Sequence, residues 1–155
     1  MEKNVSGIHP STCRSMKKLG NVYFHPETKC DIIDDFAFEK CSSLKEIIIP
    51  NKVNSIGYGC FAICGALSWV IIGKKVEKIC DAAFIECDKL NYIDIPDSVK
   101  FIGDEVFKIT NDYSSNRLVE ITGMKNVEEL GHSVFMGTAI TNIRLGPKLK
   151  KIGHT

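Results

Sequence analysis

Cysteines are the residues of this sequence with the most obvious chemistry. The chain has seven, and Cys41, Cys64 and Cys87 are each 23 residues apart. In neighbouring turns of a repeat, such sulfurs would lie about one strand spacing apart, within backbone reach of a bridge, but on parallel Cβ vectors. The odd total, the lack of an export signal and the small, weakly polar side chain favour buried structural thiols. Disulfides and a metal site remain as alternatives, although Cys60 and Cys64 lack a second ligand pair for zinc.

Histidines, nucleophiles and lysine clusters form no catalytic constellation in the sequence. The four histidines are scattered, and no serine or cysteine has a context that resembles a nucleophile elbow or a triad. His132 is interpreted as a solvated side chain. The lysines at 74–75 and at 148, 150 and 151 favour solvated turns over phosphate sites. We therefore predict no catalysis, no cofactor and no metal.

The cysteine spacing belongs to an internal repeat of 23 residues. Columns of one residue class share this spacing along the chain: Phe38, Phe61, Phe84 and Phe107; Ile33, Ile56, Ile79 and Ile102; Leu44, Leu67 and Leu90; Ile47, Val70 and Ile93; and Val53, Val76 and Val99. A period of this length indicates a solenoid, because a single unit cannot bury its apolar face and must stack on copies of itself. Function should therefore be sought on surfaces that several units build together.

Each unit predicts one strand and one helical turn. The segment L-x-x-I-x-I alternates at period two, is rich in β-branched residues and ends at Pro or Gly, which is typical of a strand followed by a turn. Successive strands should pair in parallel about 4.8 Å apart. From Ile-Gly through A-F-x-x-C-x-x-L, apolar residues recur three apart, which favours helix or 3₁₀ on the opposite wall. The predicted fold class is α/β, a solenoid with short parallel strands on one face and helical or 3₁₀ turns on the other.

Departures from the register define the predicted domain organisation. Residues 1–32 do not fit the repeat and predict a degenerate N-terminal cap with a strand near Val22, whereas residues 33–155 predict about five units. Phe107 and Phe135 are 28 residues apart, so five residues are inserted, near 110–117. Gly57, Gly103, Gly131 and Gly153 share one column, which predicts a positive φ or a close backbone approach.

These columns resemble the BspA-like class of leucine-rich repeats, whose units read L-x-x-I-x-L-P-x-x-L-x-x-I-G-x-x-A-F-x-x-C. The resemblance covers about residues 33–153, with Phe38, Cys41, Pro50 and Ile56-Gly57 at the family's offsets. It implies a curved solenoid that binds other proteins, often at the surface of bacteria and parasitic protists. It implies no catalytic residues.

The outward positions of the strands are the candidate binding site. Alternation places Trp69, Tyr92, Ile48 and Ile71 outside the core, where burial does not explain them. Four charged residues at the same outward positions of the strands complete the candidate partner-binding set: Glu46, Asp94, Glu120 and Arg144. An exposed apolar centre with a charged rim is typical of a protein interface. The alternative is that these side chains only stabilise the sheet through cross-strand pairs.

Composition excludes several other classes of function. A net charge of +1, from 20 basic and 19 acidic residues, gives no electrostatic case for nucleic acid. No apolar run approaches membrane-spanning length, and the N-terminus lacks the apolar core of a signal peptide. The sequence as given predicts a cytoplasmic protein, or a cell-surface one if it is a piece of a longer protein.

The predicted function is a non-catalytic protein–protein interaction module that binds a protein partner through the outward strand face. The alternative is a structural or assembly piece. The strand predicted at 141–145 has a unit before it but no complete unit after it, and an open ladder tends to recruit another strand. That arrangement would permit a homo-oligomer through the C-terminal repeat, residues 140–152, or continuation into a longer array.

Overall fold

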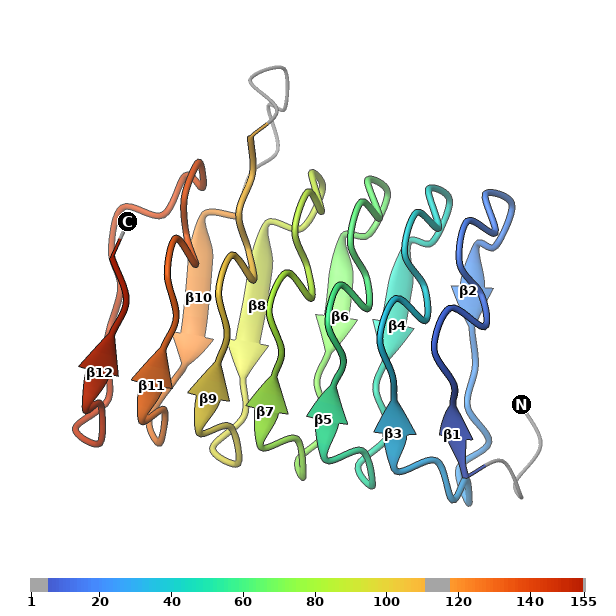
Figure 1. Cartoon of the computed structure of the whole chain (residues 1–155), viewed down its shortest axis with the longest axis horizontal. Helices are drawn as coiled ribbons and strands as arrows, with labels where there is room; N and C mark the ends of the chain where they lie inside the picture. The colour runs from blue at the N-terminus through green and yellow to red at the C-terminus, as the bar shows by residue number, and fades with distance from the viewer. Residues whose placement is uncertain (1–5, 111–117, 155) are drawn as a thin grey trace.

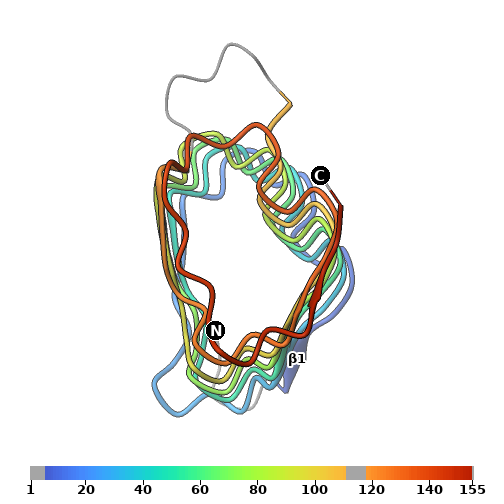
Figure 2. The ribbon, with the colours of Figure 1, turned by 90° about the vertical axis from the view of Figure 1, so that its left-hand side faces the viewer.

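Each 23-residue unit forms one turn of a flattened solenoid and contributes two short strands (Figures 1 and 2). The computed structural model describes residues 6–110 and 118–154. A seven-stranded parallel sheet, here called the first wall, contains β1 (Gly7–Ile8), β3 (Ile32–Ile33), β5 (Ser55–Ile56), β7 (Lys78–Ile79), β9 (Phe101–Ile102), β11 (Glu129–Leu130) and β12 (Lys151–Ile152). The strand at the Ile-Gly pair, which builds this wall, was not predicted.

The predicted L-x-x-I-x-I strands build the opposite side, here called the second wall. It consists of β2 (Asn21–Val22), β4 (Glu46–Ile48) and β6 (Trp69–Ile71) in one parallel sheet, and β8 (Tyr92–Ile95) and β10 (Glu120–Gly123) in another. The register places Glu46 beside Trp69 and Ile47 beside Val70. The prediction of parallel strands stacked one unit apart is therefore confirmed.

The core is a set of columns that run along the solenoid axis between the two walls. The phenylalanine rings of successive turns stack with nearly parallel planes, with ring centroids 5.3 Å apart for Phe38 and Phe61 and also for Phe61 and Phe84. The stack continues through Phe107 to Phe135. Ile33, Ile56 and Ile79 form a fully buried column beside it. The periodicity thus predicted the core correctly.

The prediction of helical or 3₁₀ turns, and with it the α/β class, is wrong: the described residues contain no helix, and the fold is a β-solenoid. In a helix each N–H donates to the carbonyl four residues back. Here the amides of Phe36, Phe38 and Lys40 instead donate to carbonyls of the next turn, each at 2.8 Å. The amides between them donate to the carbonyl three residues back, which closes isolated four-residue turns. Phe36 and Lys40 have positive φ, 55° and 59°. The segment is therefore a run of tight turns tied to its neighbours.

The glycine that recurs after isoleucine along this chain marks a close approach of backbones. A Cβ at Gly57 would collide with the backbone of Asp34 and Asp35 in the preceding turn. Gly57 itself does not have a positive φ; the left-handed residue lies two positions later, at Gly59, with φ 54°. Of the two explanations predicted for this column, contact between turns is the one that applies.

The N-terminal segment forms a turn of its own against the first repeat. β1 pairs with β3 through Gly7 and Ile32, and β2 pairs with β4 through Val22 and Ile47. The capping strand predicted near Val22 is thus present, and a second strand precedes it. The division of the chain at residue 33 stays a prediction. Most of the predicted insertion lies outside the described residues.

The last turn differs from its predecessors. Residues 141–145, predicted as a strand, have no strand pairing in the structure. Their repeat is one residue shorter than 23, and among the described residues no later turn packs beside them on this wall. Ile143, Leu145 and Ile152 occupy core columns yet are exposed.

Candidate functional site

The outer face of the second wall carries the four apolar residues that alternation placed outside the core. The exposed fractions are 55% for Ile48, 52% for Trp69, 40% for Ile71 and 41% for Tyr92. Ile48 lies directly beside Ile71 in the register of β4 and β6, and β8 with Tyr92 follows as the next strand (Figure 1). The predicted exposure of all four side chains is confirmed. They come from three adjacent strands and form one surface.

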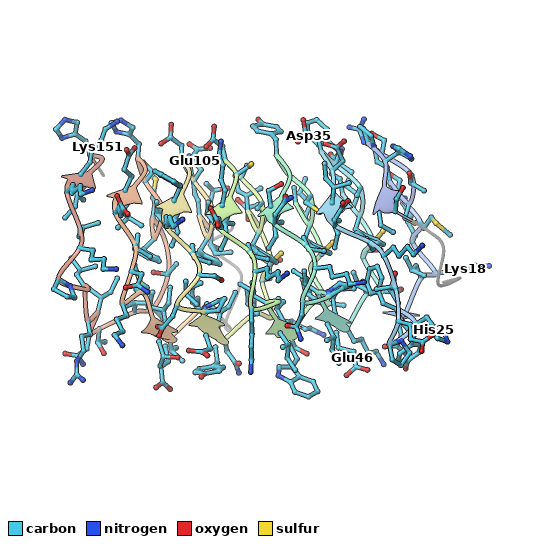
Figure 3. All side chains as sticks on the ribbon, turned by 90° about the horizontal axis from the view of Figure 1, so that it is seen from below. Lys18, His25, Asp35, Glu46, Glu105 and Lys151 are labelled. Carbon is cyan, nitrogen blue, oxygen red and sulfur yellow. The ribbon has the colours of Figure 1, made fainter. Side chains whose placement is uncertain are left out.

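Charged members of the predicted set surround this surface unevenly. Glu46 precedes Ile48 on β4 and points away from the core on the same side as His25 (Figure 3). Asp94 and Glu120 are exposed on β8 and β10. Arg144 is exposed but lies in the irregular segment between β11 and β12, so it is not held in a strand as predicted. The structure therefore brings seven of the eight residues together on strands.

Hydrogen bonds fix the polar end of the face. The hydroxyl of Tyr92 lies 3.1 Å from Thr122 Oγ1, and Thr122 donates to Asp94 Oδ1 at 2.5 Å. Because Thr122 gives its proton to the carboxylate, the tyrosine hydroxyl is the donor in the first bond. The Tyr92 ring is thereby restrained while its face stays open to solvent.

Tyr23 is a member of the same surface that sequence reasoning missed. The pairing of Val22 with Ile47 places Tyr23 next to Ile48, and its side chain is exposed. The signal was a 25-residue spacing, from Ile8 to Ile33 and from Val22 to Ile47. A search at the 23-residue period alone does not find it, because residues 25–29 make this unit two residues longer.

A groove lies at the Tyr23 end of this face. It has a volume of about 500 Å³ and is lined by side chains of β2, β4 and β6 together with the turns that follow them. Tyr23 and Pro26 line it on the β2 side, Ile48 and Ile71 belong to β4 and β6, and Lys74 comes from the turn after β6. This volume is within the range of small-ligand and side-chain pockets.

The outer face of the first wall has a different chemistry. Ion pairs link its successive turns at the residues just before the strands: Lys100 Nζ lies 3.1 Å from Glu77 Oε2, and Lys150 Nζ lies 2.6 Å from Glu128 Oε2. Phe101 on β9 is a large apolar residue exposed there, beside a hollow of about 380 Å³. Charged side chains thus pair with each other on this wall, whereas apolar ones gather on the second wall.

The cysteine column has the structural role predicted for it. All seven cysteines are free thiols, and five are buried. Cys41, Cys64 and Cys87 each donate a hydrogen bond to a backbone carbonyl of the preceding turn, at 3.0, 3.1 and 3.2 Å. Burial raises the pKa of the Cys64 thiol to about 12 and the pKa of Cys87 well above its ordinary value. Such thiols are poor nucleophiles and poor metal ligands, because both roles need the thiolate.

His132 caps the backbone of the next turn. The amide of His154 donates to His132 Nδ1 at 2.9 Å, just as the amide of His132 donates to Asp104 Oδ1 at 2.7 Å. Among residues 6–110 and 118–154, no group of three or more His, Cys, Asp or Glu side chains is placed to hold a metal. His132 is exposed as predicted, and its ring also joins the last two turns.

The repeat geometry corresponds to a known family. A sequence profile described as "BspA type Leucine rich repeat region" matches residues 6–118 and 31–155, in six copies. Because the match covers nearly the whole chain, the chain belongs to the BspA-type leucine-rich-repeat family. A comparison with curated protein sequences finds no match. The part of the chain that the structure describes has no helix that could span a membrane.

Several solved structures share this fold. A leucine-rich repeat protein from Bacteroides ovatus is 20% identical, with a TM-score of 0.61 over 95% of this chain and 48% of its own. A leucine-rich cell surface protein from Faecalibacterium prausnitzii is 28% identical, with a TM-score of 0.61 over 79% of this chain and 32% of its own. The pneumococcal vaccine antigen PcpA is 19% identical, with a TM-score of 0.58 over 88% and 42%. The chain spans less than half the length of each.

Proposed function

We propose that this chain is a non-catalytic protein–protein interaction module whose binding face is the outer surface of the second wall, centred on Trp69 and Tyr92. The observation that carries the proposal is the exposure of Ile48, Trp69, Ile71 and Tyr92 side by side on three adjacent strands. Aromatic side chains at the centre of a polar-rimmed patch supply much of the affinity of protein interfaces.

The contrast between the two walls supports the choice of face. Cross-strand pairing of apolar residues stabilises any sheet, so it would serve equally well on the first wall. There the outward positions of β11 and β12 carry Glu129 and Lys151, which form an ion pair instead. A need for sheet stability alone does not account for this asymmetry between walls, whereas a binding role for one wall does.

The test compares two alanine variants in binding to extract from the source cells. The Trp69→Ala, Tyr92→Ala variant should lose partners that the wild type captures, with affinity for a captured partner falling roughly 30-fold, or about 2 kcal/mol. Phe101→Ala is the matched control, because it removes an exposed aromatic from the opposite wall. If the double variant captures the same partners but has a lower free energy of unfolding, these residues stabilise the sheet and do not bind a partner.

The cellular location that this function fits best is the cell surface, within a longer protein. Support comes from the description of the F. prausnitzii protein as a cell surface protein and from the fraction of that chain, 32%, that this chain covers. Intact cells can be treated with an oxidant of indoles that does not cross membranes. If Trp69 stays unoxidised under this treatment, the protein is not at the cell surface.

A second candidate function is assembly through the C-terminal end. Ile152 is 57% exposed, whereas Ile102, two turns earlier in the same column, is 2% exposed. β12 is the last strand of the first wall and pairs only with β11 among the described residues. A second copy stacked on this end would cover the column and extend the ladder. Sedimentation equilibrium tests this: Ile143→Lys with Ile152→Lys should convert a dimer to a monomer, and a monomeric wild type at high concentration contradicts assembly.

A further inference from the structure

The groove at the Tyr23 end of the binding face has a basic mouth. Lys52 and Lys74 lie in the turns after β4 and β6, on successive units, and both line the groove. Both side chains are exposed, and within the described residues neither ammonium is close enough to a carboxylate to form an ion pair. By contrast, Lys100, Lys150 and Lys151 on the first wall are all paired with acidic side chains of the adjoining unit.

Negative charge lies on the binding face away from Lys52 and Lys74. Glu46 lines the groove toward the start of β4, and Asp94 and Glu120 lie beyond Trp69 on the following strands. A carboxylate brought to this face is therefore attracted by Lys52 and Lys74 and repelled by Glu46, Asp94 and Glu120. The charge distribution therefore favours the Lys52 and Lys74 end for an acidic group of a ligand.

The β2 side of the groove is formed before any ligand arrives. The loop at 25–29, two residues longer than its counterparts, projects from the solenoid (Figure 2). Its backbone is tied into a turn, since the amide of Glu27 donates to His25 Nδ1 at 3.1 Å and the amide of Thr28 to the His25 carbonyl at 2.9 Å. Thr28 is buried and accepts a bond from the Cys30 amide at 3.2 Å. A loop held in this way loses little conformational entropy when a ligand docks against it.

The apolar lining of the groove comes from isoleucines of two adjacent strands. Ile48 and Ile71 lie side by side in register, with Tyr23 on the β2 side of Ile48. A large apolar side chain resting on them would exchange water for contact with three apolar groups. This surface is continuous with Trp69, which neighbours Glu46 in the same register.

We propose that this groove binds an extended segment of a partner protein in which a large apolar side chain lies two residues from an acidic one. In an extended chain, residues two apart point to the same side and are separated by roughly 7 Å. The apolar side chain then rests on Ile48 and Ile71, and the carboxylate faces Lys52 and Lys74. This inference rests on the proposed function, because it names the chemistry of the partner for the same face.

A library of random 12-residue peptides displayed on phage tests the inference. Selection on the wild-type protein should enrich peptides with a large apolar residue two positions from Asp or Glu. Selection on the Lys52→Glu, Lys74→Glu variant should move that preference to Lys or Arg, because the charge at the mouth is reversed. Trp69, the only tryptophan of the chain, reports binding by its fluorescence. Peptides selected on the wild type should bind the reversed variant at least tenfold more weakly.

The matched control is the Lys75→Glu, Lys148→Glu variant. It changes the net charge by the same amount at two exposed lysines that do not line the groove. Its affinity for the selected peptides should stay within twofold of the wild type. Circular dichroism of all variants checks that each retains the wild-type β signal, so that a loss of binding is not a loss of folding.

Three results would overturn the inference: enriched peptides that lack the acidic residue, equal affinity for both charge variants, or no enrichment at all. Failure of the proposed function is a separate result. In that case the Trp69→Ala, Tyr92→Ala variant binds the natural partner as tightly as the wild type does. If that double variant still binds the natural partner more weakly while the Lys52→Glu, Lys74→Glu variant binds it as the wild type does, the binding face is supported and the assignment of the groove is wrong.

Discussion

The ring of Phe84 lies between those of Phe61 and Phe107, with centroids 5.3 and 5.7 Å away and ring planes within 10° of parallel. Phe84 is buried. Phe84→Ala removes a ring from the middle of this stack, so it should lower the free energy of unfolding by about 3–5 kcal/mol, the usual cost of a large-to-small change in a core. Urea unfolding measures the loss. Phe101→Ala, at an exposed aromatic, should cost far less, and equal losses would contradict the importance of the stack.

Gly57 should be intolerant of any side chain. A Cβ there would meet the backbone of Asp34 and Asp35, which belongs to the neighbouring turn and cannot move aside as a flexible side chain could. Gly57→Ala should therefore lower the free energy of unfolding by about 1–3 kcal/mol through overpacking. Gly20→Ala is the control, because a Cβ at Gly20 meets no atom within 4 Å. Thermal melting of the two variants should separate them, and similar melting temperatures would refute the role of close approach.

Stability should fall in alkaline solution because of the buried thiols. In the folded chain, burial raises the pKa of Cys64 from 9.0 to about 12, whereas the unfolded thiol ionises near 9.0. Between these values the folded state retains a proton that the unfolded state releases. The contribution of Cys64 is therefore fully present below pH 9 and decreases as pH rises toward about 12, by up to about 1.4 kcal/mol per pH unit.

Urea unfolding at pH 8 and pH 10.5 checks this dependence. Lysine and tyrosine also titrate in this window, so the informative quantity is the difference between the wild type and Cys64→Ala. The variant lacks the thiol and should lose less stability between the two pH values. Parallel losses in both proteins would show that Cys64 ionises equally in the folded and unfolded states.

The 23-residue periodicity correctly predicted the features that recur in every unit. It failed where a unit changes length and where hydrogen bonds to neighbouring turns set the backbone conformation. The columns of Phe84 and Ile79 and the exposure of Trp69 follow directly from 23-residue spacing and alternation. Tyr23 was missed because its unit is two residues longer. The helical prediction failed because apolar residues three apart suit helix and tight turns alike. The bonds that decide between them run from Phe38 to Cys60 in the next turn, and no local pattern specifies those.

The groove could not have been predicted from the repeat. Its β2 side comes from residues 25–29, which interrupt the period, and its mouth from Lys52 and Lys74, which belong to different columns of successive units. Sequence reasoning interpreted Lys74 as a solvated turn residue, and it is indeed exposed. Its significance depends on the position of Ile48 and Ile71 beside it, which only the stacking of turns determines.

Two isoleucines of one column should respond differently to the same substitution. Ile102 is packed between β7 and β11, whereas Ile152 on β12 has a turn on one side only among the described residues. In dilute solution, Ile102→Ala should lower the free energy of unfolding by about 2–5 kcal/mol, and Ile152→Ala by less than about 1 kcal/mol, because little of its surface is removed from water. Repeating the measurement at high protein concentration separates the candidate functions. If copies stack through this end, Ile152→Ala becomes costly there, because it then opens a cavity in a shared core. An unchanged small cost at every concentration would exclude this contact between copies and leave the outer face of the second wall as the interaction surface.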